Sequence, residues 1–149
     1  MFCAREALHS ESDVEQKLVW PLLTRPNPVG MGYEPAEIAT KHDIRRYEID
    51  KGSKKRLYYP DYIVLLAGFP AMVVEAKAPG ESLDDALDEA RLYAAKLNES
   101  FPSGINPCLR ILASNGEVVA TAASDSTIID LELPFSRLAL SDPDYANLS

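Results

Sequence analysis

Residues 59–77 read YPDYIVLLAGFPAMVVEAK. It holds two apolar runs, rich in valine, isoleucine, leucine and aromatic residues, on either side of Gly68-Phe69-Pro70. Such runs are typical of buried strands, and the glycine and proline indicate a turn between them. The stretch is therefore predicted to form an antiparallel β-hairpin.

The charged residues of this hairpin lie near its two ends. In a hairpin centred on Gly68, Asp61 and Glu75 face each other, because each is seven positions from the turn. Their Cβ atoms would be about 5 Å apart, and Lys77 would point to the same face as Glu75. Two carboxylates and an ammonium at the edge of an apolar sheet are unfavourable unless they have a task, such as binding a metal.

The spacing of these three residues, D-x13-E-x-K, suits a hard divalent cation. Mg²⁺ prefers carboxylate oxygens and keeps several waters, and the carbonyl of Ala76 could add one more ligand. A bound cation would lower the pKa of a water and screen the charge on a phosphate. Lys77 would then orient the water or stabilise the pentacovalent phosphorus. An ion pair at a strand end would show the same spacing, so this alternative stays open here.

Length and composition indicate one soluble domain. The chain has 149 residues, of which 46% are hydrophobic and 26% charged, as in ordinary globular proteins. Its longest uncharged run, residues 62–74, is too short to span a membrane. Residues 1–9 lack the apolar segment of a secretory signal, and two cysteines, Cys3 and Cys108, suggest neither a disulfide framework nor a zinc site. A cytoplasmic location is expected.

The charge of the chain is unevenly distributed. A net charge of −8 argues against nonspecific binding of nucleic acid over the whole surface. Seven of the 15 basic residues nevertheless lie between residues 41 and 56: Lys41, Arg45, Arg46, Lys51, Lys54, Lys55 and Arg56. Four of them, Lys51, Lys54, Lys55 and Arg56, are candidate contacts for phosphates. Each neutralised phosphate would add sequence-independent affinity. A solubilising loop would have the same composition, so both interpretations stay open.

The remaining segments predict helices and further strands. Ser10 or Ser12 can cap a helix over about residues 11–23, which Pro21 would kink or end early. Residues 38–50 read as a helical or extended piece leading into a strand. Ser82 can cap a second helix with an apolar stripe. Further strands are expected over residues 44–49, 55–67, 108–113, 118–122 and 128–133.

This order predicts a mixed α/β fold with a central mixed β-sheet flanked by helices. The helix between Lys77 and Cys108 is long enough to cross over and lay a later strand parallel to an earlier one. Residues 1–149 are expected to form a single domain with a core of about residues 10–134. The polar tail, residues 141–149, is expected to be poorly ordered.

Two sets of motifs in this chain resemble a known family. Pro60-Asp61 followed by Glu75-Ala76-Lys77 resembles the PD-(D/E)XK nuclease signature. The surroundings resemble more specifically the N-terminal nuclease domain of type I restriction enzyme R subunits. The segments that carry this likeness are Glu11-x-x-Val14, Pro21-Leu22-Leu23, Gly32-Tyr33, Val74 to Pro79, Tyr93-Ala94 and Ser114-Asn115-Gly116. Together they cover roughly residues 11–120, which is most of the chain.

The resemblance implies a magnesium-dependent DNA endonuclease, a hydrolase of phosphodiester bonds that belongs to a restriction-modification system and could also use Mn²⁺. Its core would have the PD-(D/E)XK restriction-endonuclease-like fold. By this likeness Asp61 and Glu75 are metal ligands and Lys77 is the catalytic lysine. Glu11 would be the acid from the first helix, with Glu15, one turn along, as the second choice. An acid at position 11 could equally serve the helix dipole.

The chain departs from the family pattern in two ways. Many of these nucleases carry a Q-x-x-x-Y motif near the DNA phosphates, and here Glu89 precedes Tyr93 in place of glutamine. This acid favours an alternative in which the domain binds nucleic acid without cleaving it. The chain also has no phosphate loop and hence no ATP site. Partners would be DNA and the helicase/translocase and methylation-specificity subunits of a restriction complex. A third hypothesis is a metal bound only for stability.

Overall fold

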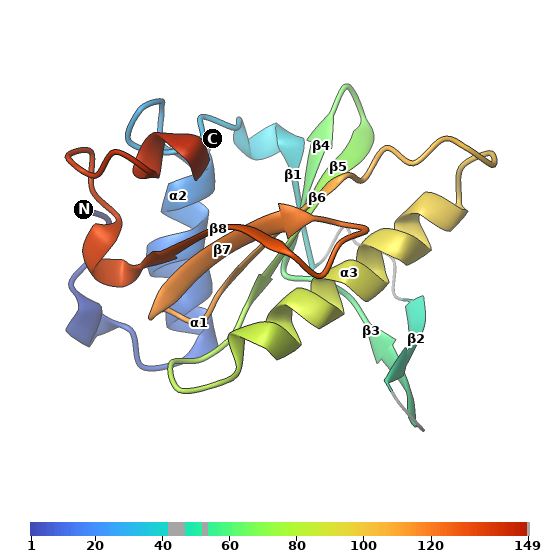
Figure 1. Cartoon of the computed structure of the whole chain (residues 1–149), viewed down its shortest axis with the longest axis horizontal. Coiled ribbons are helices and arrows are strands. Elements are labelled where there is room, and N and C mark those ends of the chain that lie inside the picture. The colour runs from blue at the N-terminus through green and yellow to red at the C-terminus, as the bar shows by residue number, and fades with distance from the viewer. Residues whose placement is uncertain (42–46, 52–53, 149) are drawn as a thin grey trace.

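The computed structural model describes residues 1–41, 47–51 and 54–148, and the strands within residues 47–58 by their backbone alone. The centre of the molecule is a six-stranded mixed sheet (Figure 1). In spatial order its strands are β1 (Ile38–Thr40), β4 (Tyr62–Leu66), β5 (Phe69–Ala76), β6 (Arg110–Ser114), β7 (Val118–Ala123) and β8 (Ile129–Pro134). A separate two-stranded sheet pairs β2 (Tyr47–Lys51) with β3 (Lys54–Tyr58).

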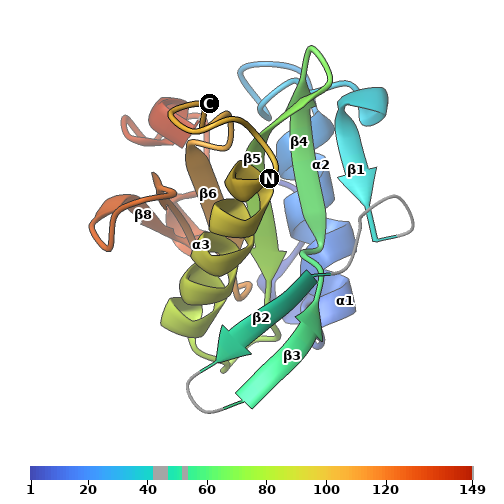
Figure 2. The ribbon, with the colours of Figure 1, turned by 90° about the vertical axis from the view of Figure 1, so that its right-hand side faces the viewer.

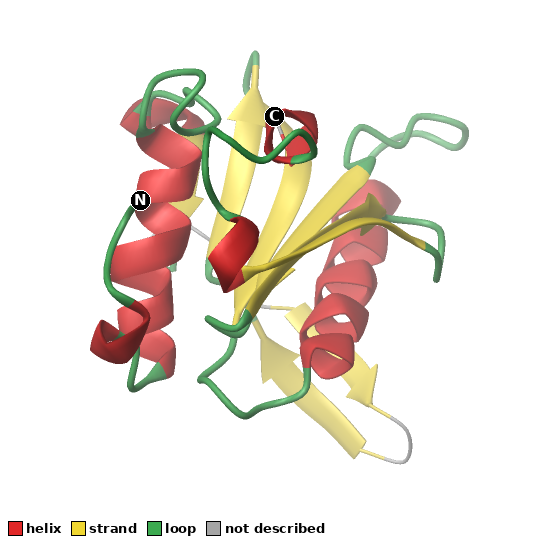
Figure 3. Ribbon diagram, turned by 60° about the vertical axis from the view of Figure 1, so that its left-hand side comes forward, coloured by secondary structure: helices red, strands yellow, loops and turns green. Residues whose placement is uncertain are grey.

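Helices cover both faces of the large sheet. On one side lies a continuous N-terminal helix made of α1 (Glu11–Asp13), the π-helical segment η2 (Val14–Val19) and α2 (Trp20–Thr24). On the other side lies α3 (Leu83–Glu99), as Figure 3 shows. Short 3-10 helices complete the chain: η1 (Arg5–Ala7), η3 (Pro35–Glu37), η4 (Phe135–Arg137) and η5 (Tyr145–Leu148). The predicted mixed α/β class is confirmed. Within the described part of the chain, no helix has the length and apolarity needed to cross a membrane.

The central hairpin forms with the predicted register. Strands β4 and β5 are antiparallel, and Tyr62 pairs with Val74. The turn itself is Ala67-Gly68, whose φ angles of 51° and 81° are those of a tight two-residue turn. A turn centred between these two residues would shift the register by one, and a β-bulge after Val64 restores it. Asp61 and Glu75 therefore lie one position beyond the last pair on neighbouring strands.

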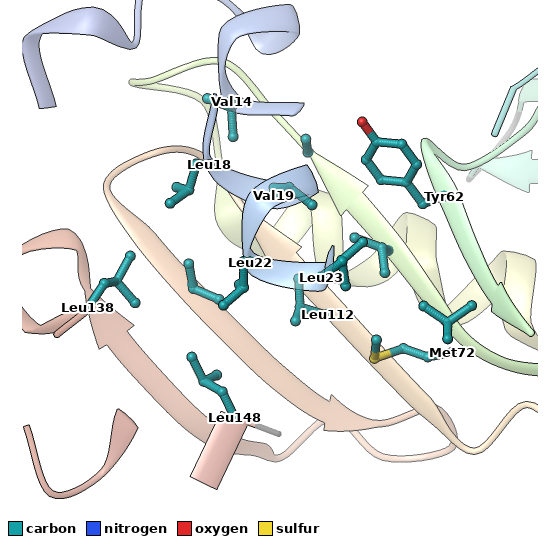
Figure 4. Packing of buried hydrophobic residues seen from close by; sticks show 14 of the residues in the cluster. Val14, Leu18, Val19, Leu22, Leu23, Tyr62, Met72, Leu112, Leu138 and Leu148 are labelled. Carbon is teal, nitrogen blue, oxygen red and sulfur yellow. The ribbon is translucent and has the colours of Figure 1, made fainter. Parts of the chain in front are cut away.

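The part of β5 from Met72 to Ala76 is buried on both faces, and its alternation builds two apolar cores. Val74 and Leu112 face the N-terminal helix, where they pack with Leu18 and Leu22 (Figure 4). Val73 belongs to the second core, under α3. Both valines are 0% exposed. Burying one such side chain contributes about 1.5–3 kcal/mol, so the position of β5 between the two helices is strongly fixed.

The crossover after the hairpin is the predicted one. Ser82 caps α3 by accepting a hydrogen bond from the backbone N–H of Asp85 at 3.3 Å. The helix then returns the chain so that β6 pairs parallel to β5, with Val73 beside Ile111. Parallel strands require such a crossover. This arrangement places α3 directly over the end of β5 that carries Glu75.

The predicted long strand over residues 55–67 is instead divided. β3 ends at Tyr58 and β4 begins at Tyr62, and the two belong to different sheets. Pro60 lies in the break, where its missing N–H and fixed φ interrupt a ladder. The predicted strand over residues 44–49 appears as β2, from residue 47 on, while residues 42–46 lie outside the described part. Residues 52–53, between β2 and β3, lie outside it as well.

Two further segments remain to be compared with the sequence. Ile38–Thr40 forms the edge strand β1, antiparallel to β4, which is the extended one of the two alternatives for this segment. At the C-terminus, where a poorly ordered tail was expected, η5 folds back and buries Tyr145 and Leu148. The Tyr145 hydroxyl donates a hydrogen bond of 2.6 Å to the carbonyl of Val29. Burial of these two side chains holds the C-terminal segment against the domain despite its polar composition.

Candidate functional site

Three carboxylates converge where the N-terminal helix passes the start of β4. Glu11 comes from α1, Glu15 from η2 and Asp61 from the residue before β4. One oxygen of each lies within 4.8 Å of one oxygen of the others. Glu11 and Glu15 are half-buried, and Asp61 is only 3% exposed. Like charges this close are unfavourable without a cation, so the group is a candidate metal centre.

The N-terminal helix presents two acids to this point. Ser10 caps it by accepting the N–H of Asp13 at 3.1 Å, so the helix begins at Glu11. The π-helical segment then starts at Val14 and carries Glu15. π-Helical segments are rare in proteins, and those that occur are often found at functional sites. The sequence predicted Glu11 with Glu15 as an alternative, and the structure brings both to Asp61.

Asp61 is held by the neighbouring strand. Its Oδ2 accepts a hydrogen bond of 2.7 Å from the backbone N–H of Ala76, at the end of β5. Its Oδ1 forms an ion pair of 2.8 Å with Lys41. The break at Pro60 leaves Asp61 outside the β4 ladder, so its side chain can reach across. The predicted ligand atom of Ala76, its carbonyl oxygen, stays a prediction.

Lys41 is a member of this cluster that the sequence analysis did not single out. Its Nζ lies 2.9 Å from Glu15 Oε1 in addition to its contact with Asp61. The register of β1 explains the position, because Thr40 pairs with Tyr62 and so brings the next residue beside Asp61. Burial lowers the pKa of Lys41, but the hydrogen bonds that its ammonium donates to Asp61 and Glu15 outweigh burial and raise the pKa. Its ammonium is therefore firmly charged.

The crowding changes the protonation of the helix acids. Burial, with the hydrogen bond and charge of Asp61, raises the pKa of Glu15 to about 7, although Lys41 opposes this. Burial also raises the pKa of Glu11, against the charges of Lys77 and Lys41. A cation bound beside these carboxylates would favour their charged forms and lower both pKa values.

A second cluster lies on the α3 side of β5. Lys77 Nζ forms an ion pair of 2.9 Å with Glu89 Oε2 from α3. Glu75 and Glu89 are buried, at 4% and 7% exposure. Strand alternation places Glu75 on the same side as Val73, which packs beneath α3. Burial lowers the pKa of Lys77, but the hydrogen bond that it donates to Glu89 and the charges of Glu89, Glu75 and Glu11 outweigh burial and raise the pKa.

The predicted site residues are thus distributed over two adjoining clusters. Among the described residues, the acids within 4.8 Å of one another include Asp61 but not Glu75. The two clusters adjoin at Ala76, whose N–H binds Asp61 and which lies between Glu75 and Lys77 in the chain. Glu11 also acts on Lys77, because the charge of each affects the pKa of the other. A single centre that includes Glu75 stays a prediction.

The predicted contacts to nucleic acid fall in two places. Lys51 ends β2, and β3 contains the other three, Lys54, Lys55 and Arg56, with Lys51 paired to Lys54. Their side chains lie outside the described part. In α3, Glu89 pairs with Lys77, and Tyr93 is 0% exposed within the second core. A fully buried ring offers no surface to DNA, so Tyr93 supports α3 instead.

The acids fit a divalent ion such as Mg²⁺ or Mn²⁺. These ions take carboxylate oxygens as ligands and keep several waters, so a few carboxylates are enough. Glu11, Glu15 and Asp61 supply oxygens from two separate elements, and Asp61 is fixed by a backbone hydrogen bond. The donor set is that of a hard cation, and thiol and imidazole ligands are not part of it.

Comparison with known proteins identifies the family. The family described as type I restriction enzyme R protein N terminus (HSDR_N) matches residues 42–127. No curated protein and no solved structure matches the chain. The matched region contains Asp61 and Glu75, whereas Glu11 and Lys41 precede it. The match supports a restriction-related nuclease role. Because it spans more than half of the chain, the chain belongs to the family of the type I restriction enzyme R protein N terminus.

Proposed function

We propose that residues 1–149 act as one metal-dependent DNA endonuclease domain of the type I restriction R-subunit kind, which hydrolyses phosphodiester bonds with Mg²⁺ or Mn²⁺. The observation that carries this proposal is the convergence of the carboxylates of Glu11, Glu15 and Asp61 within 4.8 Å. They adjoin the strand end that carries Glu75 and Lys77. Family membership supports the nuclease role, and the acids supply the chemistry.

In this proposal the acids hold the metal. Asp61 would contribute Oδ1, while its Oδ2 accepts the N–H of Ala76. Glu11 and Glu15 would contribute from the helix, and Glu75 from the adjoining cluster. Glu15, with its pKa raised to about 7, would give up a proton when a cation binds. The bound ion would supply a water of lowered pKa and screening of the phosphate charge.

Lys77 is the proposed catalytic lysine. Its side chain is 20% exposed, and its ammonium lies close enough to Glu11 for their charges to interact. A cation in this position can orient the attacking water or stabilise the charge that develops on the phosphate. It must share its ammonium between Glu89 and the substrate. Glu89 therefore limits how far Lys77 can act.

DNA is the proposed polymer substrate. The hairpin of β2 and β3 carries four basic residues, and β3 ends three residues before Asp61. Figure 2 shows this hairpin extending from the end of β4 that adjoins α1. Contacts with phosphates there would hold a duplex beside the acids. With a net charge of −8, the domain would depend on other subunits of a cytoplasmic restriction complex for delivery to DNA.

A second candidate function is a nucleic-acid-binding module that has lost cleavage. The observation that favours it is the 2.9 Å ion pair between Lys77 and Glu89, an acid at the position where many nucleases of this kind carry the glutamine of a Q-x-x-x-Y motif. This pair could hold the catalytic ammonium away from a phosphate. The two candidates share the same binding surface and differ in the availability of Lys77.

A cleavage assay distinguishes them. Purified protein is incubated with supercoiled plasmid and Mg²⁺ or Mn²⁺, beside Asp61→Ala and Lys77→Ala. Nicking that requires the metal and is lost in both variants supports the endonuclease. DNA binding without nicking by the wild-type protein supports the second candidate. Equal nicking by the wild-type protein and both variants would contradict the proposed site and point to a contaminating nuclease.

A further inference from the structure

Lys41 contacts two of the three acids that form the proposed metal centre. Its Nζ lies 2.8 Å from Asp61 Oδ1 and 2.9 Å from Glu15 Oε1. We propose that the Lys41 ammonium is a built-in competitor of the divalent metal: it occupies the cation position between Glu15 and Asp61, and metal binding requires its displacement. This inference rests on the proposed metal centre and adds to it a residue that controls when the centre fills.

The oxygens used by Lys41 are the ones a metal would need. Asp61 has one oxygen, Oδ2, tied to the backbone N–H of Ala76, and the other, Oδ1, paired with Lys41. The accessible oxygen of the most buried acid is thus already in contact with a cation. Glu15 Oε1 completes the same contact from the helix side. An ammonium bridging two carboxylates satisfies them in the way a divalent ion would.

The two cations cannot occupy this position together. A divalent ion bound to Asp61 and Glu15 would lie within a few ångströms of an ammonium that kept both contacts, and at that distance their repulsion is strong. The ammonium loses this competition only if it can leave. Lys41 can, because its side chain is 41% exposed and lies just past the end of edge strand β1. Asp61, by contrast, is 3% exposed and fixed.

Competition gives the domain a threshold. Without metal, Lys41 compensates the crowded acids and stabilises the fold. With metal, the same lysine raises the concentration that is needed to fill the centre. Lys41 precedes the region that matches the family, which begins at residue 42. The proposed competition therefore rests on the contacts of Lys41 in this structure and not on the family match.

Metal affinity of matched variants tests the proposal. Lys41→Gln removes the ammonium, and Lys41→Arg retains a cation. Lys17→Gln is the control, because Lys17 lies on the same helix as Glu15, has a similar side-chain exposure of 46%, and pairs with Asp13 at 2.9 Å instead of with the centre. Mn²⁺ binding is measured by titration calorimetry, and folding by circular dichroism. We expect Lys41→Gln to bind Mn²⁺ about tenfold more tightly, and the other two to bind as the wild type does.

A labelling experiment on the wild-type protein supplies a readout that needs no variant. Lys41 is acylated with an amine-reactive reagent and quantified by mass spectrometry, with and without Mn²⁺. Release from its two carboxylates should increase labelling several-fold, while Lys17 stays constant. Tighter binding by Lys41→Gln together with increased labelling supports the proposal. Unchanged or weaker binding by a folded Lys41→Gln, or protection of Lys41 by Mn²⁺, would overturn it.

The proposed function fails in a different way. Asp61→Asn removes a ligand charge, so it should lose Mn²⁺ binding if the centre exists. If neither the wild type nor Lys41→Gln binds Mn²⁺, the metal centre itself is wrong and the competition falls with it. If both bind with the same affinity and Asp61→Asn does not, the centre stands and the competition alone is overturned.

Discussion

Two lysines flank the end of β5, and each is paired with acids, but they differ in how they are held. Lys41 bridges Glu15 and Asp61 from the end of an edge strand, and its side chain is 41% exposed. Lys77 follows β5 directly, pairs with Glu89 and is 20% exposed. The side chain of the first can turn away from its acids into solvent, whereas the second is enclosed between sheet and helix.

This difference between Lys41 and Lys77 suggests that the two lysines have separate roles in one acidic site. A lysine at an exposed edge can exchange with a metal ion, and a lysine anchored in the sheet can act on a substrate held by that ion. Only the anchored lysine lies in the region that matches the family. The difference between the two positions is therefore testable by treating the lysines and their acids in parallel.

The largest effect is expected at Asp61, which serves both the fold and the proposed metal. Asp61→Ala leaves the buried N–H of Ala76 without its acceptor, which costs about 1–3 kcal/mol of stability. It also removes a ligand, so cleavage should fall by about 1,000-fold. Asp61→Asn keeps an acceptor for the N–H, and we expect near-native stability with the same loss of cleavage. Urea denaturation and plasmid nicking separate the two roles.

Equal loss of stability in both Asp61 variants would show that charge, rather than the hydrogen bond to Ala76, holds this strand end. Active Asp61→Asn would remove Asp61 from the metal centre altogether.

Exchanging the two lysines for neutral side chains should separate their roles. Lys77→Met should reduce cleavage by about 100-fold and leave Mn²⁺ affinity within a few-fold of the wild type. Lys41→Met should instead tighten Mn²⁺ binding and leave cleavage at saturating metal close to the wild-type rate. The measurements are calorimetric titration and single-turnover nicking at saturating Mn²⁺. Loss of cleavage in Lys41→Met as large as in Lys77→Met would make both lysines catalytic and end the proposed division.

The hairpin and the crossover could be predicted because their signals are local. The apolar runs of residues 62–66 and 69–76, the intervening glycine and the Ser82 cap each specify structure within a few residues. Even so, the register was right only because a bulge after Val64 compensates a turn centred half a residue earlier than predicted. That compensation is a tertiary effect.

Lys41 was missed for the opposite reason. Strand β1 has three residues, Ile38–Thr40, which is too short for a period of two to be recognised, and its partner β4 lies some twenty residues further along the chain. The π-helical segment that carries Glu15 has no sequence pattern that distinguishes it from an α-helix. The partner of Lys77 on α3 likewise depends on how the helix packs across β5. Ionic contacts between separate elements depend on how those elements pack together, and no local sequence pattern predicts this packing.

Stability and metal affinity should both depend on pH through Glu15, which contacts Lys41. The pKa of Glu15 is raised to about 7 by burial and by Asp61, with Lys41 opposing. The metal-free folded state therefore binds more protons than the unfolded state, and the resulting stability is lost as the pH rises from 4.5 toward 7. Metal affinity should change in the opposite sense, because binding releases this proton, and it should rise by up to about tenfold per pH unit below 7.

Calorimetry of Mn²⁺ binding between pH 5.5 and 8 measures this dependence, and buffers of different ionisation enthalpy report the released proton directly. Glu15→Gln removes the group and should flatten the profile. Glu11, whose pKa is also raised, would leave a residual slope. A slope that persists unchanged in Glu15→Gln would assign the proton to Glu11 instead.

The smallest effect is expected on the Lys77 side, at Glu89. Glu89→Gln introduces the glutamine of the Q-x-x-x-Y motif and replaces an ion pair of 2.9 Å by a weaker neutral hydrogen bond. Because the amide oxygen still accepts a hydrogen bond from Lys77, the ammonium is released only in part, and single-turnover cleavage should rise by only about two- to fivefold. Glu99→Gln is the matched control, because Glu99 pairs with Lys96 on the same helix at 3.3 Å, away from the acids. If Glu89→Gln lowers cleavage while Glu99→Gln does not, Glu89 positions Lys77 for the reaction rather than restraining it. Glu89 would then hold the anchored lysine in the position that the reaction needs.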